Sequence, residues 1–521
     1  MQIAHSNSSA RESHSGNRTS QEFGPYELSQ YLPNPSNFLL TDDPKWLIGL
    51  LHRWTFHQWR FRQLRKQITV NPVRIPTMIL PSMTRLLSTF LVPFVTMCWL
   101  VALAPAQEVP LAFTGAQLIT ISGETIEHGV LVVQRGKIVA VGPRGMPLPV
   151  GATVRDVTGL VIMPGLIDTH SHIGSPAGGD QSAPIQPDTR VLDAVDVRDA
   201  SIQKAQAGGI TTANIMPGSG HLISGQTLYL KLRDGNTIAD LLITNKEGRV
   251  AGGLKMANGT NSRKDPPFPG TRAKSAALVR EKFVAAQDYR DKIARAKGDA
   301  DKLPPRDLAL EILVEVLEGQ RVVHHHTHRH DDILTVLRLQ KEFGFRVVLH
   351  HVSDAWKIPD EIAAAKVPCS IILLDSPGGK LEARDVDWKS GAVLEKVGVP
   401  VGFHTDDPVT DSRLFIRSAA FAVRAGMTRA GALRGLTLAG AEMLDLQTRI
   451  GSLDPGKDAD FVLLSGDPFS VYTHVLETWV DGVKVFDREN PKDRLWSTGG
   501  YGAGNPRAAH LCCFGTWEDA Q

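Results

Sequence analysis

The segment GLVIMPGLIDTHSH, residues 159–172, decides the fold class of this chain. Its apolar run leads directly into two histidines, His170 and His172, which are two residues apart. Side chains two apart on a strand point to the same side, so both imidazoles face one direction where the strand ends. A buried strand that ends in polar groups is typical of parallel α/β proteins, in which reactive side chains collect at the carboxyl ends of the strands.

Similar segments recur between residues 161 and 447. Apolar runs end in VVHHHTH (322–328), RVVLHHVSD (346–354) and VPVGFHTDD (399–407), and helical patterns lie among them at 277–297 and 331–343. This alternation of buried strands and helices predicts a parallel α/β architecture, and its length favours a TIM (β/α)8 barrel over 161–447. An open doubly wound sheet is the alternative, although no glycine-rich nucleotide motif follows a strand.

The segments on either side of this region have a different pattern. Residues 111–143 alternate apolar and polar side chains between glycine-containing turns, and the same pattern returns at 449–469 and 474–487. Such alternation predicts short antiparallel strands. We therefore expect β-rich flanks over 107–160 and 448–490.

The two ends of the chain do not show these patterns. Residues 83–106 combine Arg85, an apolar run and the triplet Ala104-Pro105-Ala106, which is the layout of a secretory signal peptide cleaved after Ala106. We therefore expect an exported protein, periplasmic or extracellular; the alternative is a membrane anchor over 86–103. Residues 1–82 are then a non-structural leader or the result of a misassigned start, and 491–521 a flexible tail that carries Cys512 and Cys513.

Composition excludes several classes of protein. Of 521 residues 42% are hydrophobic and 21% charged, and 57 Lys+Arg against 55 Asp+Glu leave a formal net charge of +2. That balance argues against binding to nucleic acid or a membrane surface, so we expect a small-molecule partner and no stable membrane span after cleavage. Four cysteines are too few and too irregularly placed for a disulfide framework. The sequence leaves open whether the protein forms homo-oligomers.

Histidines and one aspartate at the strand ends form a candidate metal site. His324, His326 and His328 share one face of their strand, His350 and His351 end the next, and Asp406 shares a face with His404. Imidazoles with a carboxylate suit Zn²⁺, and less well Mn²⁺ or Fe²⁺. The alternative, a surface histidine tract that binds metal adventitiously, does not explain why His or Asp recurs after successive apolar runs.

With these motifs, the chain resembles the amidohydrolase superfamily, specifically its imidazolonepropionase-like and prolidase-like branch. The resemblance covers residues 110–487, and PGLIDTHSH and GSLDPGKDADFVLLSGDPF are its most specific parts. It implies a TIM barrel with a small composite β-sandwich domain built from the two flanks. It implies one or two divalent metals on His170, His172, His326, His351 and Asp406, with Lys255 as a lysine that carbon dioxide carbamylates to bridge two ions. The register leaves His328 as an alternative to His326.

Such a site predicts hydrolysis of a carbon–nitrogen bond in an amide, cyclic amide or dipeptide. Asp406 is expected to act as general base toward a metal-activated water, and a histidine such as His328 to polarise the scissile carbonyl. Arg263 and Arg272, in the insertion 257–275, are candidates to hold a substrate carboxylate, with solvated loop charges as the alternative. A noncatalytic scaffold, or a lactonase, phosphotriesterase or deaminase on the same metal ligands, is the competing hypothesis.

Overall fold

The computed structural model describes residues 109–176, 178–373 and 380–498. The leader, the signal peptide with its alternative membrane anchor, and Cys512 and Cys513 lie outside these residues. No helix in the described part is long and apolar enough to cross a membrane.

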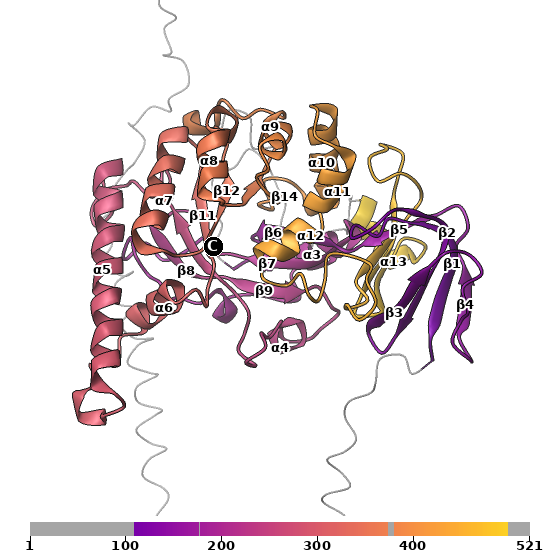
Figure 1. The fold of residues 1–521 in the computed structure, drawn as a ribbon, viewed down its shortest axis with the longest axis horizontal. Helices are drawn as coiled ribbons and strands as arrows, with labels where there is room; N and C mark the ends of the chain where they lie inside the picture. Colours follow the sequence, from indigo (N-terminus) through magenta and orange to yellow (C-terminus); the bar gives the residue numbers. More distant parts are fainter. Residues whose placement is uncertain (1–108, 177, 374–379, 499–521) are drawn as a thin grey trace, which may run out of the picture. The chain divides into compact units, whose positions relative to one another are not determined.

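The two β-rich flanks pair in one eight-stranded sheet, drawn in indigo and yellow in Figure 1. Its order is β17-β16-β15-β5-β1-β2-β3, with β4 paired to β1, and β5 meets β15 in antiparallel register. The strands are β1 (Leu111–Leu118), β2 (Ile126–Gln134), β3 (Lys137–Gly142), β4 (Thr153–Asp156), β5 (Val161–Pro164), β15 (Phe461–Leu464), β16 (Val475–Val480) and β17 (Val483–Asp487). The flanks therefore share one sheet, while the composite β-sandwich domain stays a prediction.

Local sequence explains the first hairpin of this sheet and the core beneath it. Arg135 and Gly136 connect β2 to β3, and both have positive φ (50° and 74°), as a two-residue type I′ turn requires. Phe113, Phe461 and Trp479, from both flanks, pack their rings with centroids 5.1 to 5.4 Å apart. This aromatic cluster buries the contact between the two flanks.

The central region contains two further sheets of buried strands. One has the order β6-β7-β9 and the other β14-β13-β12-β11-β10-β8. Their bounds are β6 (Leu166–Ser171), β7 (Ile210–Ile215), β8 (Ile223–Gln226), β9 (Leu228–Lys231), β10 (Leu254–Ala257), β11 (Val323–Thr327), β12 (Val347–His351), β13 (Cys369–Ile371) and β14 (Val401–Phe403). The strands from β10 to β14 are parallel, as are β6 and β7, whereas β8 and β9 run antiparallel to their neighbours.

The predicted closed (β/α)8 barrel is therefore corrected to a TIM-barrel-like α/β arrangement. Within the described residues, β6 and β14 form no strand ladder. Between β6 and β14, the side chain of Asp168 accepts hydrogen bonds from the backbone N–H (3.1 Å) and the hydroxyl of Thr405. Beyond it, Asp406 N donates to His170 O (2.9 Å) and His172 N to Asp407 O (3.2 Å). The carboxyl ends of β6 and β14 consequently stay together without a regular ladder.

Helices connect and cover these strands (Figure 1). The predicted helical stretches at 277–297 and 331–343 are confirmed as α5 and α7. The helices are α3 (Ala200–Ala207), α4 (Ile238–Leu241), α5 (Arg272–Ala296), α6 (Leu308–Leu317), α7 (His330–Phe343), α8 (Pro359–Ala365), α9 (Ser390–Lys396), α10 (Phe415–Arg424), α11 (Arg429–Gly435), α12 (Leu438–Met443) and α13 (Pro491–Thr498), with short 3-10 turns η2 (Val191–Asp193), η3 (Ala300–Lys302), η4 (Ala355–Lys357), η5 (Leu381–Ala383) and η6 (Ser412–Leu414).

One helix corrects a prediction. Residues 491–498, expected to begin a flexible tail, form α13. Pro491 occupies the first helical position, where its missing N–H costs nothing, and the side chain of Asn490 accepts a hydrogen bond from Lys492 N (3.1 Å). Trp496 packs against the central core, so tertiary contact supports a helix that its sequence alone did not reveal.

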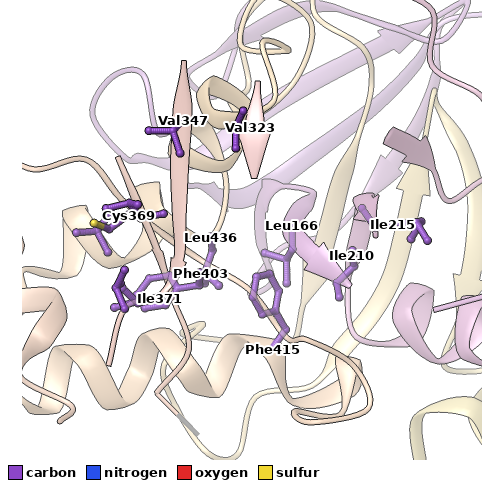
Figure 2. Close-up of a cluster of buried hydrophobic side chains, with 14 of the residues drawn as sticks. Leu166, Ile210, Ile215, Val323, Val347, Cys369, Ile371, Phe403, Phe415 and Leu436 are labelled. Carbon is purple, nitrogen blue, oxygen red and sulfur yellow. The ribbon is translucent and has the colours of Figure 1, made fainter. Parts of the chain in front are cut away.

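The apolar core holds the strands in place from their outer side. Figure 2 shows Phe415 next to Leu166 and Ile210, and Phe403 next to Ile371 and Leu436, with Cys369 nearby. These residues come from β6, β7, β13 and β14, from α10 and from the end of α11, and all are buried. Close packing of this kind leaves little freedom to the strand ends, where the polar residues lie.

Candidate metal centre

The carboxyl ends of β6, β11 and β12 and the turn after β14 bring one set of polar side chains together. His170, His172 and Asp406 each offer one ligand atom, and these atoms lie within 4.8 Å of one another. Asp406 Oδ1 is 3.2 Å from His170 Nε2 and 2.9 Å from His172 Nε2. The structure thus brings three of the predicted ligands, from β6 and from the turn after β14, close together.

The ring and carboxylate orientations in this group are fixed by the backbone. His172 Nδ1 is 2.8 Å from Met216 O, which leaves His172 Nε2 facing Asp406. Asp406 has a left-handed φ of 51°, a conformation that turns the chain out of β14. Burial raises the pKa of Asp406, but His170 and the hydrogen bonds from His170 and His172 outweigh it and hold that pKa well below its ordinary value. Asp406 is therefore ionised at neutral pH.

A second group lies beside the first. His326, His328 and His351 each offer a ring nitrogen, again within 4.8 Å of one another, and all three rings are buried. His351 Nε2 is 3.9 Å from Asp406 Oδ2, so Asp406 faces both groups. His351 and Val352 both have positive φ (69° and 45°), and for a β-branched valine this is a strained conformation of the kind found at functional sites.

Unsatisfied nitrogen atoms show that this set fits a metal. Both ring nitrogens of His326 and of His351 are buried without a hydrogen-bond partner, as is His328 Nε2, whereas His328 Nδ1 is 2.8 Å from Ser353 Oγ. Burial lowers the pKa of His328 to about 3 and those of His326 and His351 well below the ordinary value, so all three rings are neutral, and His326 and His351 can each offer a lone pair. Neutral imidazoles and a carboxylate are suitable ligands for a divalent ion such as Zn²⁺.

Lys255 on β10 lies against the first group. Its Nζ is 3.0 Å from His170 Nε2 and 3.4 Å from Met216 Sδ, and the side chain is fully buried. Within the described residues, no carboxylate forms an ion pair with it. Burial lowers the pKa of Lys255 to about 7, which makes the neutral amine accessible near physiological pH. That is the form that reacts with carbon dioxide.

The two arginines predicted to hold substrate have protein contacts instead. Arg272 begins α5, and its Nε lies 2.9 and 2.8 Å from the two carboxylate oxygens of Asp332, while a terminal nitrogen is 3.5 Å from Glu382. Arg263 Nε donates to Gly259 O (3.1 Å), within its own loop. Their role toward a substrate stays a prediction.

Sequence reasoning did not assign a role to several polar residues beneath the site. Thr169, Ser370 and His404 form one hydrogen-bonded chain, and Tyr229, His324 and His350 form another. The spacing of His324 and His350 on their strands placed them near the site, but Tyr229 and Ser370 left no signal in the sequence.

A cavity in the described part of the chain lies elsewhere. Its volume is about 770 Å³, and it is lined by residues such as Arg249, Arg321 and Arg346 that precede β10, β11 and β12. It is therefore at the amino ends of these strands, opposite the histidines. Ligand chemistry, rather than cavity volume, locates the candidate site.

Known proteins resemble this chain over most of its described length. A family model described as "Amidohydrolase family" matches residues 314–486. The crystal structure of an amidohydrolase from Thermotoga maritima MSB8 is 33% identical with a TM-score of 0.68, and the match covers 73% of this chain and 100% of that one.

Curated relatives are more distant. An imidazolonepropionase of Erwinia tasmaniensis is 27% identical over 388 residues, covering 67% of this chain and 90% of the relative. Amidohydrolase tasK of Hapsidospora irregularis is 29% identical over 394 residues, which are 69% of this chain but only 40% of that protein. The chain thus spans less than half the length of this last relative.

Proposed function

Because this chain belongs to the amidohydrolase family and is a hydrolase that acts on carbon–nitrogen bonds, we propose that it is metal-dependent and cleaves an amide, cyclic amide or dipeptide-like bond. The observation that supports metal dependence most is the pair of adjacent groups, His170–His172–Asp406 and His326–His328–His351, with their unpartnered buried nitrogens. A noncatalytic scaffold is no longer a competing hypothesis.

The metal ligands we propose are His170, His172, His326, His351 and Asp406, with Lys255 as a carbamylated bridge when two ions bind. A divalent ion in this position supplies a Lewis acid that acidifies water and polarises a carbonyl group. Lys255 supports this arrangement because its amine is buried beside His170, where the charged form is disfavoured.

Asp406 is the proposed proton carrier. It is ionised and faces both histidine groups, so it can accept a proton from the attacking water and return it to the leaving nitrogen. His328 is the proposed donor to the carbonyl oxygen. Its Nδ1 is held by Ser353, and with that nitrogen as acceptor the proton resides on Nε2, which has no protein partner and is free to donate.

Metal analysis and a substrate screen test this proposal. We expect the purified protein to bind about two equivalents of zinc with Lys255 modified, or about one without the modification, and chelation to remove the activity. N-acyl amino acids, dipeptides and cyclic amides form the screen.

Two different outcomes would contradict this proposal. A protein that binds no zinc, manganese or iron is not metal-dependent. A relative from Symbiobacterium thermophilum, 25% identical over 414 residues, is named 5-methylthioadenosine/S-adenosylhomocysteine deaminase, so the screen includes these two nucleosides. Release of ammonia from them, with no cleavage of the amides, would replace the amide proposal by deamination.

We also propose that the protein is exported through the segment 83–106. The composition of that segment supports the proposal, since Arg85 precedes an apolar run and an Ala-x-Ala site. Amino-terminal sequencing of the protein from its native host is expected to start at Gln107. A start within residues 1–82, or retention of 86–103 in the membrane fraction, would contradict cleavage.

A further inference from the structure

Three histidines lie together beneath the proposed metal ligands. His170, His350 and His404 are fully buried, and one ring nitrogen of each lies within 4.8 Å of the others. The nitrogens without a hydrogen-bond partner are His170 Nδ1, His350 Nδ1 and His404 Nε2. Buried polar atoms are normally satisfied, so these three need an explanation.

A chain of hydrogen bonds determines which nitrogen of His404 carries a proton. Thr169 Oγ1 donates to Phe403 O (3.2 Å), and a carbonyl oxygen can only accept. The proton between Thr169 Oγ1 and Ser370 Oγ (2.6 Å) therefore comes from Ser370, which leaves Ser370 Oγ to accept from His404 Nδ1 (2.7 Å). His404 thus has its proton on Nδ1 and a free lone pair on Nε2.

In His350, unlike His404, the nitrogen without a partner is the one that carries the proton. Burial raises the pKa of Tyr229 far above its ordinary value, so its phenol keeps the proton and donates to His324 Nε2 (2.8 Å). His324 Nδ1 then donates to His350 Nε2 (3.0 Å), and the proton of His350 is on Nδ1. His350 therefore has an unpartnered donor at Nδ1, whereas His404 has an unpartnered acceptor at Nε2.

His170 needs an acceptor when it binds metal. Its Nε2 faces Asp406 and Lys255, so this nitrogen is the one available as a ligand, and the ring proton must then be on Nδ1. Histidine ligands almost always donate their second N–H to a fixed partner, which sets the tautomer and the ring orientation.

We propose that His404 is a positioning residue that accepts the Nδ1–H of His170 and so presents His170 Nε2 as a metal ligand. This inference rests on the proposed metal-dependent function. In the described part of the structure the two rings are stacked, with centroids 4.9 Å and planes 23° apart, and neither His170 Nδ1 nor His404 Nε2 has a hydrogen-bond partner. We expect the hydrogen bond from His170 Nδ1 to His404 Nε2 to form when the His170 ring turns toward a metal.

The test compares Zn²⁺ affinity, by competition with a chromogenic chelator, among variants of the full chain. His404→Leu removes the acceptor at similar volume and should weaken Zn²⁺ binding about 10- to 100-fold. His404→Gln places an amide oxygen near the position of Nε2 and should restore most of that loss. The absorption spectrum of the Co²⁺-loaded protein should change in His404→Leu and return toward wild type in His404→Gln.

His325→Leu is the matched control. His325 is equally buried, and its Nδ1 bonds only to the backbone oxygen of His326, so this variant should lose a similar amount of stability without loss of Zn²⁺ affinity. Wild-type affinity in a folded His404→Leu would overturn the inference, as would an equal loss in His325→Leu. If His404→Leu does not fold, Ser370→Ala takes its place, and unchanged affinity there overturns it too. A wild-type protein that binds no metal contradicts the proposed function instead.

Discussion

Asp406→Asn is expected to reduce turnover by about 10³-fold or more while leaving the fold intact. An amide keeps the shape of the carboxylate, but it cannot accept the proton of the attacking water. The left-handed backbone at residue 406 is a conformation that asparagine tolerates as well as aspartate. Steady-state kinetics on the best substrate of the screen, with circular dichroism on the same samples, measures both expectations.

Asp411→Asn provides the control for this variant. Asp411 lies in the same turn region, where its side chain accepts a hydrogen bond from Arg413 N (2.9 Å) and pairs with the Arg413 guanidinium. Asp411→Asn should change turnover by less than about threefold, because the partly exposed ion pair between Asp411 and Arg413 contributes little. Turnover by Asp406→Asn within tenfold of wild type, at unchanged metal content, would refute the role of Asp406 as general base.

Lys231→Met is expected to lower the free energy of unfolding by about 3–5 kcal/mol. Lys231 on β9 is 1% exposed, and its Nζ lies 2.6 Å from Asp458, 3.0 Å from Asp460 and close to Asp481. Removal of the ammonium group leaves three carboxylates facing one another with little solvent. Denaturant unfolding followed by fluorescence measures the loss.

Lys137→Met is the matched control for Lys231→Met. Lys137 also contacts Asp458 (2.5 Å), but its side chain is 49% exposed, so we expect a cost of at most about 1 kcal/mol. Both lysines act on the same carboxylate, since burial raises the pKa of Asp458 but Lys231 and Lys137 bring it down to about 2. An equal decrease in the free energy of unfolding in the two variants would show that the burial of Lys231 adds nothing to stability.

Much of the candidate site follows from strand periodicity. His170 and His172, and likewise His326 and His328, share a face because they are two residues apart, and parallel strands end at one edge. The same periodicity explains why the sequence could not choose between His326 and His328. Both rings belong to the same group in the structure, so spacing alone does not separate a ligand from its neighbour.

Other features depend on contacts between distant residues. Asp168 bonds to Thr405, far along the chain, at the point where β6 and β14 form no ladder in the described residues, and β8 and β9 likewise end different sheets. Arg272 is paired with Asp332 and Glu382, which sequence proximity does not reveal. β8 and β9 run antiparallel to β10 and β7, and a local sequence pattern does not distinguish strand directions.

The pairing of β5 with β15 has a consequence for the order of folding. Ile162 is opposite Leu463, so the ribosome must synthesise most of the chain before this pair can form. A nascent chain that ends before β15 exposes an unpaired edge of β5 and part of an apolar face. Completion of this sheet therefore waits until β15 has left the ribosome, and premature termination or slow synthesis before β15 exposes the chain to aggregation.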